Sequence, residues 1–498
     1  MVLLIFFNVS VILKKDFVNI KILLMTSQME KIVSLAKRRG FAFPSSEIYG
    51  GLESCYDYGP LGVELKNNIK SAWWKAMVQA REDVVGQDAS ILMHPKIWEA
   101  SGHVEGFTDP LVDCKSCKKR FRADHIVKTD GPMTPQWMKK NFEDKKPKCP
   151  ACGGELTPIR KFNLMLKTHL GPVEDEVTTV YMRPETAQAI YVDFDTIMKS
   201  SRKRLPFGIA QIGKAFRNEI TPGDFTFRTR EFEQMEMQWF VKPSPQTLSQ
   251  EGEGRVRGKT PDEWFEYWKQ TRMQWYLDLG IKKERLRFRE QEDDERTFYA
   301  KKAVDIEYNF PFGWREIEGI HNRGNWDLSR HSEYSGKDLS VMDEETKEKF
   351  IPWVIETSAG ADRTALAFLL DAYEEIAGGR TTTTESVKEA ETVLRFSKSL
   401  APVKIAVLPL SKKEELSSIA KNIAGDLRKY WAVDYDETAS IGRRYRRQDE
   451  IGTLFAVTID FETLEDKKVT VRDRDTMKQD RVEIVQLMNY FQRKLDND

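Results

Sequence analysis

The sequence lacks a net charge. Lysine and arginine together number 78, and aspartate and glutamate together also number 78, so the formal charge is zero. The composition therefore supplies no overall positive field that would attract a polyanion, and any surface that binds nucleic acid must be local. The 498 residues contain no internal repeat and no low-complexity block. This length, with 40% hydrophobic and 31% charged residues, predicts a soluble globular protein of roughly three or four domains.

The sequence also lacks a hydrophobic run long enough to cross a bilayer. The apolar stretch from Val2 to Leu13 is too short, and lysines follow it directly. No small-residue cleavage site stands out, and a signal anchor is the alternative interpretation of this stretch. From Met29 onward the pattern predicts an amphipathic helix, which favours a translation start at Met25 or Met29. We therefore expect residues 1–28 to be an untranslated or disordered extension, the protein to be cytoplasmic, and no membrane partner.

Cysteine is scarce, and four of the five cysteines form two Cys-x-x-Cys pairs. The pairs are Cys114 with Cys117 and Cys149 with Cys152, on either side of a lysine-rich stretch. In a reducing compartment such pairs favour metal ligation over disulfides. Four thiolates fit a tetrahedral structural zinc site, and a catalytic zinc is disfavoured because four protein ligands close the coordination sphere. The alternative is four free thiols in a loop without metal.

No phosphate-binding loop of the form GxxxxGK followed by Ser or Thr occurs. A nucleotide site would therefore have to rely on arginine forks, which pair bidentately with phosphate oxygens. Residues 206–219 and 229–241 predict an antiparallel pair of strands. Period two places Arg217 and Glu219 on one side of the first strand. It places Phe232, Gln234 and Glu236 on one side of the second, and such a face suits a charged ligand better than a core.

A buried helix is predicted after Glu356, with Ser358 as its candidate N-cap. Arg363 falls in its first turn, where free N–H groups already favour an anion. With Arg217, and Arg228 on the loop between the strands, three arginines could hold a polyphosphate, and Phe232 could stack on a purine. Each arginine alone could instead pair with a nearby glutamate on a solvated sheet.

The last hundred residues alternate strand and helix. Strands are predicted over 403–410, 431–436, 454–460 and 468–473, with a helix over 411–430. This alternation is typical of a small α/β domain. Its basic run joins Arg443, Arg444, Arg446 and Arg447 to an aromatic ring, which suits single-stranded RNA, although a solvated helix face would look the same.

Several motifs in this order resemble those of class II aminoacyl-tRNA synthetases. YDYGPLGVELKNNIKSAWWKAM resembles the first class signature, with Pro60 at the dimer-forming turn. FRNE with TREFEQMEMQWF resembles the second signature, and ETSAGADR the third. YMRPETAQ, ASGHVEGFTDPLVDC and RRYRRQDEIGT narrow the resemblance to the dimeric glycyl-tRNA synthetase family, from about Met29 to the C-terminus.

The resemblance implies a two-step reaction, in which glycine is activated by ATP and then transferred to tRNA(Gly). It implies catalytic roles for Arg217, Arg363 and Glu219, with Glu316 contacting ATP or its Mg²⁺. The implied ATP-binding residues are Arg217, Asn218, Glu219, Phe227, Arg228, Phe232, Glu316, Ile317, Gly360 and Arg363. The implied glycine-binding residues are Glu185, Glu236, Glu356, Ser358, Arg122 and Arg323, of which Arg122 could equally contact tRNA or be a surface charge. Arg443, Arg444, Arg446 and Arg447 are implied to contact tRNA.

The implied fold is an α+β catalytic domain with a central antiparallel sheet, a zinc-ribbon-like insertion and a C-terminal α/β anticodon-binding domain. The catalytic domain would span 29–111 and 161–399, with a helical insertion near 244–296. The zinc insertion would span 112–160, and the anticodon-binding domain 400–498. The protein would be a homodimer. Two alternatives remain at this point, a synthetase-like RNA-binding or regulatory protein and a ligase for another small amino acid such as serine or alanine.

Overall fold

A computed structural model gives the fold of this chain. It describes residues 28–127, 135–172, 178–220, 223–243, 259–292, 300–343, 346–378, 380 and 390–495. The predicted extension over 1–28 lies outside the described residues, except for residue 28, where a helix over 28–39 begins. Within the described ranges, no helix combines the length and the apolar character that a membrane span requires.

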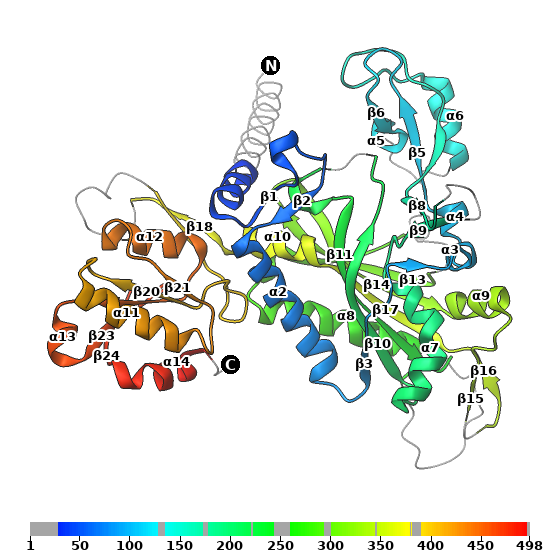
Figure 1. Cartoon of the computed structure of the whole chain (residues 1–498). Helices are drawn as coiled ribbons and strands as arrows, with labels where there is room; N and C mark the ends of the chain where they lie inside the picture. The colour runs from blue at the N-terminus through cyan, green and yellow to red at the C-terminus, as the bar shows by residue number, and fades with distance from the viewer. Residues whose placement is uncertain are drawn as a thin grey trace, which may run out of the picture.

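A seven-stranded sheet forms the centre of the catalytic body (Figure 1). All neighbouring strands run antiparallel except β10 and β3, which run parallel. The order across the sheet is β12 (Leu286–Glu290), β13 (Lys302–Phe310), β14 (Gly313–Gly324), β17 (Trp353–Gly360), β11 (Glu231–Val241), β10 (Phe207–Phe216) and β3 (Val84–Gln87). The predicted central antiparallel sheet is thus confirmed.

The two faces of the sheet differ because side chains alternate along each strand. On β11, Met235, Met237 and Trp239 are fully buried in the largest apolar core. The residues between them face the other way, and Phe240 joins a second, smaller core. That smaller core lies beneath α7 (Ala187–Ser201) and α9 (Trp326–Ser335). The rest of this second face is polar and holds the cavity described below.

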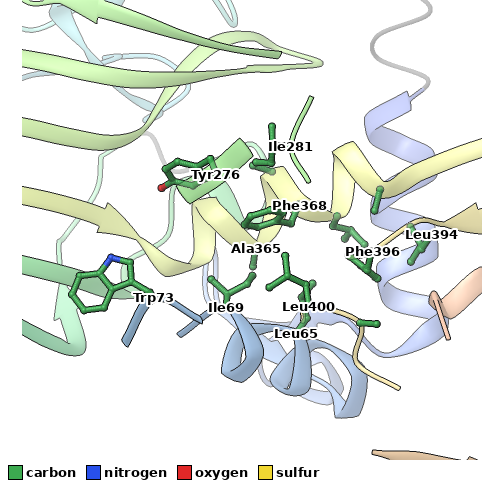
Figure 2. Packing of buried hydrophobic residues seen from close by; sticks show 14 of the residues in the cluster. Leu65, Ile69, Trp73, Tyr276, Ile281, Ala365, Phe368, Leu394, Phe396 and Leu400 are labelled. Atoms are coloured by element: carbon green, nitrogen blue, oxygen red, sulfur yellow. The ribbon is translucent and has the colours of Figure 1, made fainter. Parts of the chain in front are cut away.

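Three helices pack on the apolar face: α2 (Pro60–Trp74), α8 (Pro261–Asp278) and α10 (Ala361–Ala372). Helix α2 begins at Pro60 directly after Gly59, because proline is favoured in the first helical turn. Leu65, Ile69 and Trp73 form its buried stripe and face α10 (Figure 2). Each such side chain contributes about 1.5–3 kcal/mol when it leaves water.

The segment predicted as a helical insertion near 244–296 is part of the catalytic body. Residues 244–258 and 293–299 lie outside the described residues. Helix α8 packs across β14 and β17, and Arg272 Nε on this helix lies 2.6 Å from Glu318 Oε1, with both side chains fully buried. The same segment supplies the edge strand β12, which a prediction of helix alone missed.

The predicted strands around the second class signature are shorter than expected. Strand β10 ends at Phe216, so Arg217 and Glu219 lie just beyond it instead of on its face. The prediction of Ser358 as an N-cap is wrong, because Ser358 is still in β17 and Gly360 is the N-cap of α10. Arg363 does lie in the first turn of α10, as predicted.

The cysteine module has its own small sheet and core. Strand β5 (Thr108–Asp113) pairs with β6 (Arg120–Arg122) and β7 (Arg160–Asn163), so the module extends slightly beyond the predicted 112–160. The short helix α5 (Ala123–Ile126) and α6 (Pro135–Lys145) lie beside this sheet (Figure 1). The apolar core of the module comprises Val112, Ala123, Val127, Met138 and Phe142.

The C-terminal domain is the predicted α/β unit (Figure 1). Its sheet has the order β21 (Val433–Tyr435), β20 (Ile405–Pro409), β22 (Phe455–Ile459), β23 (Lys468–Asp473) and β24 (Gln479–Glu483). Its helices include α11 (Glu414–Leu427), α12 (Ile441–Ile451) and α14 (Leu487–Leu495). A hairpin of β18 (Tyr373–Ile376) and β19 (Glu391–Leu394) precedes the domain, and α12 packs on β19.

Candidate functional site

A single cavity of about 170 Å³ opens on the polar face of the central sheet. It brings together residues that lie far apart in the sequence. Its predicted members are Glu185, Arg217, Glu219, Phe227, Arg228, Phe232, Glu236, Glu316, Arg323, Glu356, Ser358, Gly360 and Arg363. Arginines predominate at one end, and carboxylates line the recess at the other.

Strand register builds the recess. Glu236 on β11 pairs with Ser358 on β17, which pairs with Gly319 on β14. Directly opposed residues in antiparallel strands present their side chains on the same face, so these three form one row. A Cβ at Gly319 would lie 2.7 Å from Cε1 of the His321 ring. Gly319 therefore leaves the room that this ring occupies.

Glu356 is held by an arginine and a histidine. Its carboxylate lies 3.1 Å from Arg323 NH1 and 2.9 Å from Nδ1 of His321. Burial acts to raise the pKa of Glu356, but Arg323 and His321 outweigh it and lower that pKa to about 2. Arg323 also donates from Nε to Asp327 over 2.8 Å. Glu356 is thus a fixed, charged wall of the recess.

Glu185 is also held in the charged form. Its Oε2 lies 3.3 Å from Nε2 of His103, and its Oε1 accepts a 2.9 Å hydrogen bond from Gln188. Burial acts to raise the pKa of Glu185, but His103 and Arg323 hold it below its ordinary value. Both nitrogens of the His103 ring are engaged, because Ser101 Oγ lies 2.8 Å from Nδ1.

Glu236 differs from the other two carboxylates because its hydrogen bonds come from neutral groups. Ser358 Oγ donates over 2.6 Å, Gln234 donates over 3.0 Å, and the Thr186 hydroxyl also donates. Burial raises the pKa of Glu236 to about 7, and the charges of Glu356 and Glu185 act in the same direction. A cation entering the recess would therefore find Glu236 the least compensated carboxylate.

The arginine end is more open. Arg217 donates from Nε to the Pro184 carbonyl over 3.0 Å, and its guanidinium carbon lies 5.3 Å from the centre of the Phe232 ring. Arg363 lies over the Phe227 ring at 4.5 Å, and its NH1 is 3.3 Å from Glu316 Oε2.

Arg228 pairs with Glu219 at 2.8 Å. Pairing with a nearby glutamate, which the sequence analysis gave as an alternative for each arginine, therefore does occur for Arg228. The side chains of Arg228 and Arg363 are each 28% exposed. Both guanidinium groups can therefore be reached from the cavity.

Three predicted site residues do not line the cavity. Arg122 pairs with Asp109 at 2.6 Å and with Asp124 at 2.7 Å, so its charge is already compensated. Ile317 is 1% exposed and its side chain belongs to the apolar core on the opposite face. The backbone N–H of Asn218 donates to the Leu164 carbonyl over 2.7 Å.

Sequence reasoning did not assign several lining residues. His321 lies two residues from Arg323 and two from Gly319, so period-two alternation along β14 could have placed it on the same face. Asp362 adjoins Arg363 and could have been found by its position in the third signature. The other unassigned lining residues are Thr226, Thr229 and Gly319, while Gln234 was placed on the ligand-facing side of its strand without a role.

The four cysteines of the two Cys-x-x-Cys motifs lie close together in the module. The Sγ atoms of Cys114, Cys117, Cys149 and Cys152 all lie within 4.8 Å of one another. The separations are 3.5 Å for Cys114–Cys152 and 3.7 Å for Cys117–Cys149. A tetrahedral zinc with Zn–S bonds of about 2.3 Å requires sulfur atoms about 3.8 Å apart. The donor set and spacing therefore fit zinc.

The basic run of the C-terminal domain lies on α12. Arg444 is 1% exposed, and its NH1 donates to the carbonyls of Pro409 and Asp436 over 2.6 and 2.9 Å. The prediction that Arg444 contacts tRNA is therefore corrected, because this guanidinium is used inside the domain. Arg443 is exposed, and the side chains of Arg446 and Arg447 are each 33% exposed.

Two family models match this chain. The model for the tRNA synthetase class II core domain (G, H, P, S and T) matches residues 172–373, and that for the anticodon binding domain matches residues 404–494. Together with the sheet and its cavity, these matches define a class II aminoacyl-tRNA synthetase.

Comparison with known relatives shows to which family of class II synthetases this chain belongs. The glycine–tRNA ligase of Treponema denticola is 52% identical over 470 residues, covering 94% of this chain and 97% of the relative. That of Thermobifida fusca is 52% identical over 472 residues, covering 94% and 98%. That of Clostridium acetobutylicum is 53% identical over 483 residues, with the same coverage. The chain belongs to the glycine–tRNA ligase family.

Proposed function

We propose that this chain activates glycine with ATP to form glycyl-adenylate and then transfers glycine to the 3′ end of tRNA(Gly). The observation that carries the proposal is the layout of one cavity, with three arginines at one end and an acid-walled recess at the other. An amino acid placed between them would present its ammonium group to the carboxylates and its carboxylate to the phosphates of ATP.

In the first step the glycine carboxylate attacks the α-phosphorus of ATP, and pyrophosphate leaves. Arg217 would hold the α-phosphate and the attacking carboxylate, while Arg228 and Arg363 hold the outer phosphates. Catalysis is then positioning plus neutralisation of charge that develops on phosphate oxygens. Phe232 would stack under adenine, and Glu219 would help to orient the nucleotide, together with Phe227 and Gly360. In the second step the terminal ribose hydroxyl of tRNA attacks the glycyl carbonyl and releases AMP.

Selection of glycine would follow from polar groups that lie close around the substrate in the recess. Glu236, Glu185 and Glu356 surround the place of the ammonium group, and Ser358 supplies a further oxygen. A methylene in a roomy apolar pocket changes affinity by only about 1–3 kcal/mol. A close polar wall can exclude a side chain more strongly, because a larger substrate would displace hydrogen-bonded groups such as Glu236 and Gln234.

Amino-acid-dependent exchange of pyrophosphate into ATP tests this function. Glycine should stimulate exchange, whereas serine and alanine should not. Stimulation by serine or alanine without stimulation by glycine would assign the chain to another small amino acid. Release of AMP and formation of glycyl-tRNA would then establish the second step.

Two metal ions fit the proposal. Glu316 would contact ATP or its Mg²⁺, and that ion would supply neutralisation of the outer phosphates. The four cysteines would hold a structural zinc, which would stabilise a module with a small core. Metal analysis should give about one zinc per chain; a value near zero in fully active protein would exclude the zinc.

A homodimer is supported by exposed apolar side chains near the first class signature. Ile48 and Tyr49 are each 88% exposed and Leu52 is 60% exposed, all on the loop between β1 (Ala42–Pro44) and β2 (Tyr56–Tyr58). Such a patch marks an interface when it is contiguous. Light scattering should show twice the chain mass, and Ile48→Asp with Tyr49→Asp should shift it to the monomer. A stable, active wild-type monomer would exclude the dimer.

Anticodon contacts would come from Arg443, Arg446 and Arg447 on α12. Exposed arginines can bind phosphates and stack on unpaired bases. Arg443→Ala should raise KM for tRNA without changing glycine-dependent exchange, which does not require tRNA. An unchanged KM for tRNA would remove Arg443 from the interface.

A further inference from the structure

The cysteine module is joined to the catalytic body by two segments, residues 101–107 and 163–166, which together form the neck. The first segment lies against two residues that line the active-site cavity, and the second lies against the residue that follows Arg217 in the chain. The first contacts Glu185 and Arg217, and the second contacts the backbone of Asn218. The neck is therefore well placed to hold the site residues in position.

His103 in the neck contacts the glycine end of the cavity. It is 7% exposed and does not line the cavity itself. Its Nε2 lies 3.3 Å from Glu185 Oε2. The ring packs against Trp98 at 5.5 Å and against Phe107 at 5.3 Å between ring centres. The imidazole is thus fixed on both sides, and it fixes one oxygen of a carboxylate that faces the substrate.

Phe107 in the neck contacts the ATP end of the cavity. The guanidinium carbon of Arg217 lies 5.2 Å from the centre of the Phe107 ring and at nearly the same distance from the Phe232 ring. Arg217 is thus held over two aromatic rings that come from different parts of the chain. A guanidinium group held in this way keeps the N–H groups in its own plane available for phosphate, apart from the Nε–H that donates to Pro184.

One side-chain and two backbone hydrogen bonds connect these two contacts. The Asn163 side chain donates to the carbonyl of Val104 over 2.8 Å, and Leu164 N–H donates to the carbonyl of Phe107 over 3.0 Å. The Leu164 carbonyl accepts from Asn218 N–H over 2.7 Å. The two halves of the neck are therefore bonded to each other and to the residue that follows Arg217.

We infer that His103 is a positioning residue for the glycine site and Phe107 a positioning residue for Arg217, so that the neck of the cysteine module supports the active site from outside the cavity. The inference rests on the proposed function, because it assigns Glu185 to glycine and Arg217 to ATP. His103 keeps Glu185 charged and correctly oriented for an ammonium group, while Phe107 limits where the Arg217 guanidinium can lie.

Steady-state pyrophosphate exchange tests both roles through separate Michaelis constants. His103→Leu removes the partner of Glu185 and should raise KM for glycine about tenfold to a hundredfold, the loss expected when a charged group loses a hydrogen bond. KM for ATP should stay within about twofold. His103→Gln keeps an N–H donor and should recover much of the loss.

Phe107→Leu should give the reverse pattern, with KM for ATP raised about three- to tenfold and KM for glycine nearly unchanged. His169→Gln is the matched control, because His169 is an exposed histidine on β8 (Lys167–His169) whose Nδ1 contacts Thr178 and Thr179 and which does not line the cavity. It should leave both constants unchanged. Thermal melting of each variant reports whether the chain is folded.

The two proposals fail in different ways. If the wild type shows no glycine-dependent exchange, the proposed function fails. If the wild type is active and folded His103→Leu raises both constants equally or neither, His103 does not position the glycine site. Failure of His103→Gln to recover affinity relative to His103→Leu would likewise show that the ring acts only by packing. Unchanged KM for ATP in folded Phe107→Leu would show that Phe107 does not position Arg217.

Discussion

The two ends of the cavity are built by opposite means. In the recess, Glu356 and Glu185 are buried and already paired with Arg323, His321 and His103. At the other end, Arg228 and Arg363 remain more than a quarter exposed. Charged side chains therefore form a fixed wall in the recess, whereas at the other end they remain accessible to a ligand.

On the proposed function, the difference follows from what each end would recognise. A small ammonium group offers little binding surface, so its site must be rigid and must exclude larger groups before they bind. A triphosphate offers many oxygens, so accessible guanidinium groups can adjust to it. We expect perturbations of the recess to change stability and selectivity, and perturbations of the arginine end to change catalysis and salt dependence.

Arg217→Ala should give the largest effect at the arginine end. Loss of this guanidinium removes charge neutralisation at the reacting phosphate, and kcat/KM in pyrophosphate exchange should fall about 10²- to 10³-fold. Lys214→Ala is the control, since Lys214 is an exposed cation on β10 that pairs with Glu231. A similar loss in both variants would show that general positive charge, and not the placement of Arg217, supports activity.

Arg323→Leu should show how far the recess depends on internal pairing. The substitution leaves Glu356 and Asp327 buried without their main cation, and breaking such a pair costs about 3–5 kcal/mol. The free energy of unfolding of the catalytic body, followed by urea denaturation, should fall by that amount. Arg330→Leu removes a part-exposed arginine whose NH1 is 3.2 Å from Glu333, and it should cost about 1 kcal/mol or less. Equal losses would contradict the view that the recess depends on buried ion pairs.

The pH dependence of glycine binding should report Glu236. Its pKa is raised to about 7, so in the empty site it takes up a proton as the pH falls through that value. An ammonium group binds best to the ionised carboxylate. KM for glycine should therefore rise as the pH is lowered below about 7, by up to about tenfold per pH unit.

Glu236→Gln serves as the control for this pH dependence. It should raise KM at every pH and remove the dependence, because the amide does not titrate. A KM for the wild type that is flat between about pH 6 and 8 would contradict the assignment.

Ionic strength should give the smallest effect and separate the two ends most directly. Raising it from about 0.1 M to about 1 M shortens the screening length from about 10 Å to about 3 Å. KM for ATP should rise roughly fivefold, because the arginines are accessible to salt, while KM for glycine should change less than about twofold. A larger change for glycine would show that the recess is open to solvent.

Much of the fold could be predicted from the sequence, because it depends on local pattern. Alternation along 229–241 placed Phe232, Gln234 and Glu236 on one face, and β11 has that face. Four of the five strands and the first helix of the C-terminal domain were likewise predicted within a few residues, whereas β24 was not predicted. The edge strand β12 was missed, because a short strand beside a long helix carries little signal of its own.

Some residues of the site were predicted and others were missed, because parts of the site depend on tertiary contacts. The spacing of the cysteines predicted their convergence, and the family motifs predicted Glu185 and Arg363 as cavity residues. The partners His103 and Phe107 could not be predicted from spacing, since the contact between His103 and Glu185 joins residues 82 positions apart. Arg444 looked like its neighbours in sequence, and only the packing of α12 shows that it is buried.

The row of Glu236, Ser358 and Gly319 has a consequence for assembly. A slip of one residue between β11 and β17 would send Glu236 or Ser358 to the apolar side of the sheet and dismantle the row. On the proposed function, a chain with this slip would lose glycine binding together with selectivity, because the same row of residues serves both. On the proposed function, correct strand register would therefore be a condition for selecting glycine as well as for binding it.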